Sequence, residues 1–332
     1  MGVGCAVLTQ TPVHVINIRK NRDKPGLRTQ HLAGLEAAAN LSSGRLKGGH
    51  VGATEITFYP GSTIKDHVNL SIETAGSVGL ALQTLQLACL MAKGRKISID
   101  ISGGGTFGTG APSTSFLKNV TYPAFKMMGY HVLLEVVRQG FYPKGGAVVR
   151  AIFEPPKELC PLQLEDRGTL EKVSGSIIVH NLLRKSRVGE RIAEQFKKSL
   201  AGTSSFIAIE THYVNAFSIG VGIDVWGEFS SGTRLSSGTI LGQRETRAEE
   251  VGQTAAQELM KLLSSPATVD SYLSDQILPL MAVCPAPCTI TTPTPLTLHA
   301  KTNIDILGLF FPRVKFSTEF QGSIVKISTK QA

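Results

Sequence analysis

The sequence predicts an α/β protein of the α+β type, in which a small α/β domain is inserted into a larger one. Segments with the two-residue period of strands alternate with segments of helical period along the first 155 residues. The order of expected strands and helices changes over residues 163–265. The remaining residues, 266–332, have no core of their own and are expected to complete the first domain. Repeated strand–helix–strand units of this kind indicate helices on one face of mixed sheets.

The expected elements follow from these patterns. Strands are expected at residues 13–19, 50–61, 68–74, 96–102, 130–140 and 146–155, and helices at 30–41, 76–94 and 114–129. The second block is expected to hold strands at 173–182, 205–214, 218–229 and 233–242, and amphipathic helices at 187–202 and 246–265. In the tail we expect helices at 269–283 and 302–311, a strand at 288–300 and a closing hairpin at 314–328. The large domain would thus comprise residues 1–162 and 266–332, and the small domain residues 163–265.

Composition narrows the class of protein. A net charge of +9 indicates an anionic partner, for which nucleic acid is the first candidate. No apolar run reaches the roughly 18 residues of a membrane span, so no membrane association is expected. The five cysteines are scattered and odd in number, which argues against a disulfide framework and for a reducing compartment. We therefore expect an intracellular protein, either cytoplasmic or nuclear.

Several common site signatures are incomplete in this sequence. The glycine-rich run at residues 103–108 fits the dinucleotide-binding pattern but lacks the acidic residue expected about 20 positions later, so a plain turn is favoured. No glycine loop continues into a phosphate-binding P-loop. Cys284 and Cys288 lack the second ligand pair that structural zinc requires. No G-x-S-x-G nucleophile turn occurs.

Four other features are more informative. The segment IRKNRDKPGLRTQH, residues 18–31, gathers cations around a turn that opens a helix, which suits either a phosphate clamp or a solvated basic loop. Asp275 and Gln276 lie among apolar helical positions, where they would either hold a nucleotide or form a polar helix face. Gln83 lies in an apolar helix and needs a partner from protein or ligand. His299, after an apolar strand, is by residue chemistry alone most readily a structural histidine.

Seven ordered motifs resemble those of the RNA 3′-terminal phosphate cyclase family over nearly the whole chain. They are IRKNRDKPGLRTQHLAGLEA, GATEITFYPG, TAGSVGLALQT, SGGGTFGTGAP, GFYPKGGAVV, YLSDQILPLMA and LTLHAKTN. The resemblance implies a large domain of repeated βαβαββ units with an inserted smaller α/β domain.

The resemblance also implies a reaction. A histidine attacks the α-phosphorus of ATP to form a histidine–AMP, the AMP passes to an RNA 3′-phosphate, and the 2′-hydroxyl displaces it to leave a 2′,3′-cyclic phosphate. Imidazole is a competent nucleophile at neutral pH, so one difficult step is divided into easier ones. By its place in LTLHAKTN, His299 corresponds to that nucleophile. Partners are thus ATP and RNA with a 3′-phosphate end, together with a divalent metal, Mg²⁺ or Mn²⁺.

Further site residues follow from the motifs. The positions matching the ATP contacts of the family are Gln83, Ala111, Pro112, Tyr272, Leu273, Ser274, Asp275 and Gln276. The positions matching phosphate contacts are Arg19, Arg22, Gln30 and His31. The residues that hold the metal are not assigned by the motifs.

The chain departs from the family pattern in places. The family begins with a strand and a D-G-x-x-G-E-G-G-G-Q loop that supplies a metal-binding glutamate, whereas this chain starts at MGVGCAVLTQTP. We therefore expect an amino terminus shortened relative to the family, with an effect on activity. Lys20–Asn21, Gln139 and Ala147 replace usual family residues. One branch of the family lacks the histidine and acts without catalysis in ribosome assembly. The presence of His299 favours the enzyme over that alternative and over nucleotidyl transfer to other phosphorylated ends.

Overall fold

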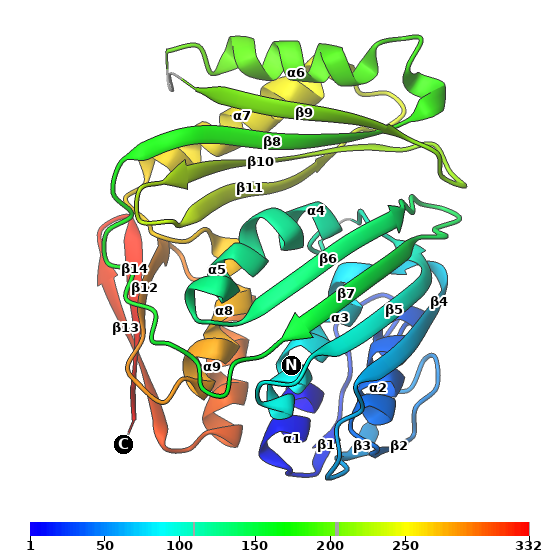
Figure 1. Cartoon of the computed structure of the whole chain (residues 1–332), viewed down its shortest axis with the longest axis vertical. Helices are drawn as coiled ribbons and strands as arrows, with labels where there is room; N and C mark the ends of the chain where they lie inside the picture. The colour runs from blue at the N-terminus through cyan, green and yellow to red at the C-terminus, as the bar shows by residue number, and fades with distance from the viewer. Residues whose placement is uncertain (109, 203–205, 332) are drawn as a thin grey trace.

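A computed structural model describes residues 1–108, 110–202 and 206–331 of the chain. This part of the chain contains four β-sheets with helices packed between and against them (Figure 1). The mixed α/β class expected from the sequence is therefore confirmed.

The central sheet contains four strands with the order β4-β5-β7-β6. Its strands are β4 (His67–Ser77), β5 (Ile97–Gly105), β6 (His131–Arg138) and β7 (Val148–Glu154). β4 and β5 are parallel, and the other two pairs are antiparallel. The crossovers are formed by α3 (Val78–Ala88) with the 3-10 turn Cys89–Ala92, and by α4 (Thr114–Phe116), the π-helical turn Leu117–Thr121 and α5 (Tyr122–Met127). The resulting order is one βαβαββ unit, as the sequence motifs implied.

Two smaller sheets repeat the second half of this unit. The first, of order β1-β3-β2, comprises β1 (Val13–Val15), α2 (Thr29–Leu41), β2 (Arg45–Lys47) and β3 (Ile56–Tyr59). The other, of order β12-β14-β13, comprises β12 (Thr289–Pro293), α9 (Leu298–Phe310), β13 (Val314–Gln321) and β14 (Ile324–Gln331). In all three sheets the strand before the helix pairs with the last strand of the hairpin after it. A further helix precedes each copy: α1 (Gly2–Thr9), α3 and α8 (Ser271–Val283).

Residues 170–264 form a separate sheet of order β11-β10-β8-β9. The elements of this segment are β8 (Leu170–His180), the 3-10 turn Asn181–Leu183, α6 (Val188–Ser199), β9 (Ile207–Val214), β10 (Val221–Phe229), β11 (Arg234–Leu241) and α7 (Ala248–Ser264). Helices α6 and α7 cover the outer face of this sheet in Figure 1. Its own apolar cluster includes the buried Ile192, Phe196 and Val225, whereas the three other sheets share one large cluster. The domain boundaries stay a prediction.

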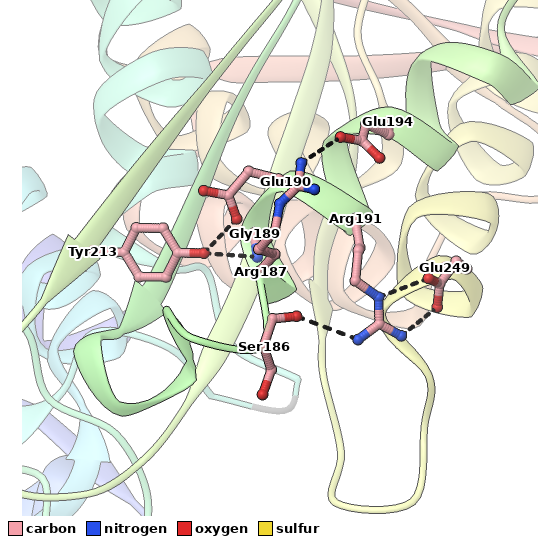
Figure 2. A network of polar contacts seen from close by, with 8 residues as sticks. All are labelled: Ser186, Arg187, Gly189, Glu190, Arg191, Glu194, Tyr213 and Glu249. Atoms are coloured by element: carbon pink, nitrogen blue, oxygen red, sulfur yellow. Dashed lines mark hydrogen bonds and ion pairs between the residues drawn. The ribbon is translucent and has the colours of Figure 1, made fainter.

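Polar contacts hold α6 to its neighbours, as Figure 2 shows. The Arg191 guanidinium donates to both carboxylate oxygens of Glu249 on α7, at 2.7 and 2.8 Å. The hydroxyl of Tyr213 on β9 donates to Glu190 at 2.6 Å. Paired charges at the surface contribute little individually, but a two-bond arginine–carboxylate pair fixes geometry. These contacts therefore keep α6 in register with α7 and β9.

Some predicted elements differ from the structure. The strand expected at 13–19 covers only Val13–Val15, and that expected at 50–61 only Ile56–Tyr59. Helix α1 and the three-residue β2 were not predicted. Helix α1 is apolar on nearly all sides and buried through Val3–Val7, so it has no amphipathic period to find. The five cysteines are free thiols, as expected.

Asp224 joins the separate sheet to the central unit. Its side chain, 0% exposed on β10, accepts hydrogen bonds from the hydroxyls of Ser113 and Thr239. Ser113 in turn caps α4 by accepting the Phe116 N–H at 2.9 Å. Burial raises the pKa of Asp224 to about 6, against the lowering effect of these hydroxyls. Burial of the protonated carboxyl therefore costs less free energy than burial of the carboxylate.

Replacing Asp224 by asparagine should change how stability depends on pH. The folded pKa of about 6 exceeds the model-compound value of 3.8, so the folded state binds this proton more tightly than the unfolded state. The resulting stabilisation is full below about pH 4 and is lost as the pH rises through 6. Between pH 5 and pH 7 the free energy of unfolding of the wild type should therefore fall by about 1 kcal/mol relative to that of Asp224→Asn. Urea unfolding at several pH values measures this. Exposed Glu319→Gln should show no such change relative to the wild type, and a pH-independent difference for Asp224→Asn would contradict the prediction.

Candidate active site

A cavity of about 650 Å³ lies between α3, α8, the start of α9 and the strand β11. It brings together positions that are far apart in the sequence. Of the predicted nucleotide and catalytic positions, seven line it: Gln83, Ala111, Pro112, Tyr272, Asp275, Gln276 and His299. The two others, Leu273 and Ser274, are buried in α8 and do not line this cavity. The opposite wall is supplied by Gly238–Leu241 of β11, which no motif had indicated.

His299 lies in the first turn of α9, and not at the end of a strand as its surroundings in the sequence predicted. The helix begins there because Thr297 caps it. The Thr297 hydroxyl oxygen accepts the Ala300 N–H at 2.8 Å and donates to Asp275 Oδ1 at 2.6 Å. The His299 side chain is exposed at the cavity wall. An exposed imidazole on a capped helix turn is accessible to a ligand, unlike a structural histidine in a core.

Asp275 connects α8 with α9. Besides the bond from Thr297, its main-chain oxygen accepts a bond from the Asn303 amide at 2.8 Å. Burial raises the pKa of the Asp275 carboxyl, while the hydrogen bond from Thr297 and the nearby charge of His299 lower it. Asp275 on α8 and His299 on α9 both line the cavity. Thr297 and Asp275 together hold the first turn of α9 against α8.

Tyr272 offers an aromatic face at the cavity. Its ring is 57% exposed and packs edge-on against Phe116, with 6.2 Å between ring centroids. Gly238 lies beneath the ring, and a Cβ atom there would come within 2.8 Å of Tyr272 Cε2. The glycine also has φ +76°, which other residues rarely adopt. The close approach of β11 to Tyr272 thus depends on glycine at position 238.

Four glutamines line the same cavity: Gln83, Gln86, Gln243 and Gln276. Gln276 is internally paired: its Oε1 accepts from the Thr121 hydroxyl at 3.1 Å, and its amide donates to the Tyr272 carbonyl at 3.3 Å. Gln83 is half-buried. Gln86, 4% exposed, has a buried Oε1 without a partner among the described residues, and sequence reasoning missed it. The signal was available, because residues three apart on a helix share a face.

The predicted phosphate positions are not gathered at this cavity. Gln30 lines a second cavity next to it, while Arg19, Arg22 and His31 line neither. The Arg19 guanidinium donates to the carbonyls of Lys24 and Gly26, at 2.8 and 3.1 Å, so it organises its own loop. His31 Nδ1 accepts the Arg28 N–H at 3.1 Å. Burial, with the charges of Arg19 and Arg28, lowers the pKa of His31.

The cavity residues do not by themselves form a metal site. Within residues 1–108, 110–202 and 206–331, no group of three or more His, Cys, Asp or Glu side chains is arranged to hold a metal ion. The divalent metal therefore stays an expectation. Among the same residues, no helix has both the length and the apolar character needed to cross a membrane.

Comparison with known proteins identifies the family. The profile described as RNA 3′-terminal phosphate cyclase matches residues 1–317. The chain is 39% identical over 300 residues to an RNA 3′-terminal phosphate cyclase of Methanothermobacter thermautotrophicus, covering 90% of this chain and 86% of that protein. It is 37% identical over 328 residues to the protein of the same name from Thermococcus kodakarensis, covering 98% of this chain and 92% of that one. A match of this length and identity shows that the chain belongs to the RNA 3′-terminal phosphate cyclase family.

Proposed function

We propose that this protein converts an RNA 3′-phosphate to a 2′,3′-cyclic phosphate at the expense of ATP, with His299 as the nucleophile. The observation that carries the proposal is the exposure of His299 in a cavity that also contains Tyr272, Gln83 and Gln276. Names of the matching relatives support the overall reaction, and the cavity supports the assignment of its residues.

The proposed chemistry proceeds in three balanced steps. An imidazole nitrogen of His299 forms a bond to the α-phosphorus of ATP, the bond to the β-phosphate oxygen breaks, and pyrophosphate leaves. A terminal oxygen of the RNA 3′-phosphate then attacks the same phosphorus and displaces the imidazole, which gives RNA–AMP. Finally the 2′-hydroxyl oxygen attacks the RNA phosphorus, its proton leaves, and AMP departs. The histidine intermediate divides one difficult displacement into easier ones.

Residues around His299 have roles that follow from their contacts. Tyr272, Ala111 and Pro112 line the cavity and are suited to hold the adenine, because an aromatic face and a proline ring bind a flat base. Gln83 and Gln86 are suited to donate or accept hydrogen bonds deeper in the cavity. Thr297 and Asp275 position the first turn of α9, and the half-buried Asp275 carboxylate favours the positive charge that the imidazole ring of His299 carries while its nitrogen is bonded to phosphorus.

The proposal is tested by incubating the protein with α-labelled ATP and Mg²⁺ or Mn²⁺, with and without a 3′-phosphorylated RNA. We expect an acid-labile protein–AMP adduct without RNA, and a phosphatase-resistant RNA end when RNA is added. If the protein binds RNA while leaving its end unchanged under all conditions, the proposal is wrong and a non-catalytic role in ribosome assembly or rRNA processing takes its place.

The aromatic face of Tyr272 should contribute to ATP affinity. We expect Tyr272→Ala to raise the Kd for ATP about 10-fold, because stacking of a base on an aromatic ring is worth roughly 1–3 kcal/mol. Tyr272→Phe keeps the ring and should stay within about 2-fold of the wild type. Equilibrium binding of a fluorescent ATP analogue measures both. Leu309→Ala removes an exposed apolar side chain from the far end of α9 and serves as the control. If Tyr272→Ala and the wild type bind the analogue with equal affinity, the base does not stack on Tyr272.

A further inference from the structure

A second cavity adjoins the one that contains His299. It has a volume of about 590 Å³ and shares Leu80, Gly108, Ala111, Leu241 and Gln243 with the first. Its other walls come from the end of β4 and from two loops, residues 139–147 and residues 215–220. We call these the hairpin loop and the facing loop. Since the two cavities share a wall, a ligand that fills the second reaches the edge of the first.

The hairpin loop presents an exposed aromatic ring at this second cavity. Tyr142 lines the cavity and is nevertheless 81% exposed. It lies in a tight turn that the Gly145 N–H closes by donating to the Phe141 carbonyl at 2.8 Å. Phe141 itself is buried and stacks on Phe107, with 5.7 Å between centroids and 11° between planes. The turn is therefore anchored from below, while the Tyr142 ring remains available to a ligand.

The facing loop adds apolar surface and is attached to the hairpin loop. Ile219 lines the cavity and is 57% exposed, and Phe217 is 55% exposed. The Lys144 N–H donates to the Ser218 hydroxyl at 3.1 Å. The Arg138 guanidinium lies 4.4 Å from the centroid of the Phe217 ring. The two loops thus form one surface of aromatic and apolar side chains, with the cations Lys144 and Arg138 beside them.

Glycine is required where the loops meet. A Cβ atom on Gly146 would lie 2.2 Å from a carbon of the Phe217 ring, and the residue has φ +82°. Arg138 Nε also donates to the Gly146 carbonyl at 2.7 Å. The Phe217 ring, the guanidinium and the hairpin loop are consequently held as a unit, so the surface is preformed.

We propose that this second cavity binds the last bases of a single-stranded RNA, with Tyr142 stacking on one base and Lys144 facing the phosphate backbone. The inference rests on the proposed function, since it places the RNA beside the reactive cavity. Bases stack on aromatic side chains at roughly 1–3 kcal/mol each without regard to sequence, and nearby cations follow the backbone. The exposed Lys144 forms no ion pair with any residue that the structure describes, so its charge is available.

The position of the cavity favours a single strand over a duplex or a peptide. A 3′-phosphate has to reach the wall shared with the His299 cavity, and the bases before it must then occupy the second cavity. In a duplex the neighbouring base pairs cover both flat faces of an internal base, so Tyr142 could not stack on it. Gln30, which lies in the second cavity, is also within the segment whose motif matches phosphate contacts. The terminal phosphate would therefore lie between the bases on Tyr142 and the imidazole of His299.

The test measures RNA affinity without ATP, by fluorescence anisotropy of a labelled six-nucleotide RNA with a 3′-phosphate. We expect Tyr142→Ala to raise the Kd about 10-fold and Tyr142→Phe to leave it within about 2-fold of the wild type. Phe320→Ala removes a similarly exposed ring from β13, which lines neither cavity, and should leave the Kd unchanged. Protein–AMP formation in the absence of RNA should be the same in all four proteins.

RNAs with one abasic nucleotide separate stacking from a structural effect. When the base is missing at one of the last three positions, the RNA should bind the wild type about 10-fold more weakly than intact RNA. The same abasic RNA and intact RNA should bind Tyr142→Ala with equal affinity. The inference is overturned if the missing base and the Tyr142→Ala substitution weaken RNA binding independently, so that their losses add. It is also overturned if Tyr142→Ala binds intact RNA as tightly as the wild type does. Either result leaves the proposed function standing. A wild-type protein that binds RNA in this pattern but forms no adduct would instead contradict the proposed function alone.

Discussion

Replacement of His299 by asparagine is expected to abolish the protein–AMP adduct and to lower RNA cyclisation by at least about 10³-fold. A nucleophile has no substitute in its own step, and losses of this size or greater are typical when one is removed. Asparagine is similar in size and polar, and the side chain is exposed, so α9 and its cap on Thr297 should remain. Labelled adduct on a denaturing gel and conversion of a 3′-phosphorylated RNA are the two measurements.

A second substrate separates the chemical step from binding. RNA–AMP prepared beforehand enters the sequence after the histidine step, so His299→Asn should still cyclise it at a measurable rate. The variant should also bind ATP within about 3-fold of the wild type, because the residues proposed to hold the base lie elsewhere in the cavity. If labelled AMP is still attached to the variant in an acid-labile form, another residue is the nucleophile and the assignment of His299 is wrong.

Replacement of Asp270 by alanine should have the largest effect on stability, a loss of about 3 kcal/mol. The Asp270 side chain is 1% exposed and caps α8, where its Oδ1 accepts the N–H groups of Tyr272 and Leu273 at 2.9 and 2.8 Å. Its Oδ2 accepts the Ser236 N–H of β11 at 3.0 Å. Loss of a cap costs up to about 2 kcal/mol, and a buried N–H left without a partner costs about 1–3 kcal/mol. The variant no longer has to bury a carboxylate, which offsets part of this loss.

Urea unfolding at pH 7 gives the stability change directly. Asp305→Ala, at an exposed position on α9, should change the free energy of unfolding by less than about 0.5 kcal/mol. Since Asp270 also joins α8 to β11, the variant should bind ATP more weakly at temperatures where it is still folded. A loss in Asp270→Ala no greater than in Asp305→Ala would mean that the cap and the contact with β11 are dispensable.

The sequence predicted those features that depend on neighbours along the chain. Periodicity located β4–β7 and the helices α6 and α7, because each has one polar and one apolar side. It failed for α1, which is buried on nearly all sides, and for the start of α9, where the cap on Thr297 outweighs the strand-like run before it. Local signals therefore failed for a short helix without a polar side and for a helix start that a single cap determines.

The candidate site divides in the same way. Motifs indicated His299, Tyr272 and Gln276, and the structure brings these positions to one cavity. The wall formed by β11 was not predicted, because it depends on contacts between segments separated by many residues. Arg19 was predicted near phosphate but hydrogen-bonds its own loop in this structure, which shows that a cluster of cations in a sequence does not reveal where each side chain points.

The threefold recurrence of one strand–helix–hairpin arrangement bears on how this cavity arose. His299 is the second residue of α9, and Gln30 is the second residue of α2, the corresponding helix of another copy. Likewise Gln276 and Gln83 are each the sixth residue of corresponding helices, α8 and α3, and both face the cavity. Duplication of an ancestral segment would account for this agreement, with an imidazole and an amide now at corresponding positions of two copies. Ancestral reconstruction could therefore begin by aligning the copies within this one chain.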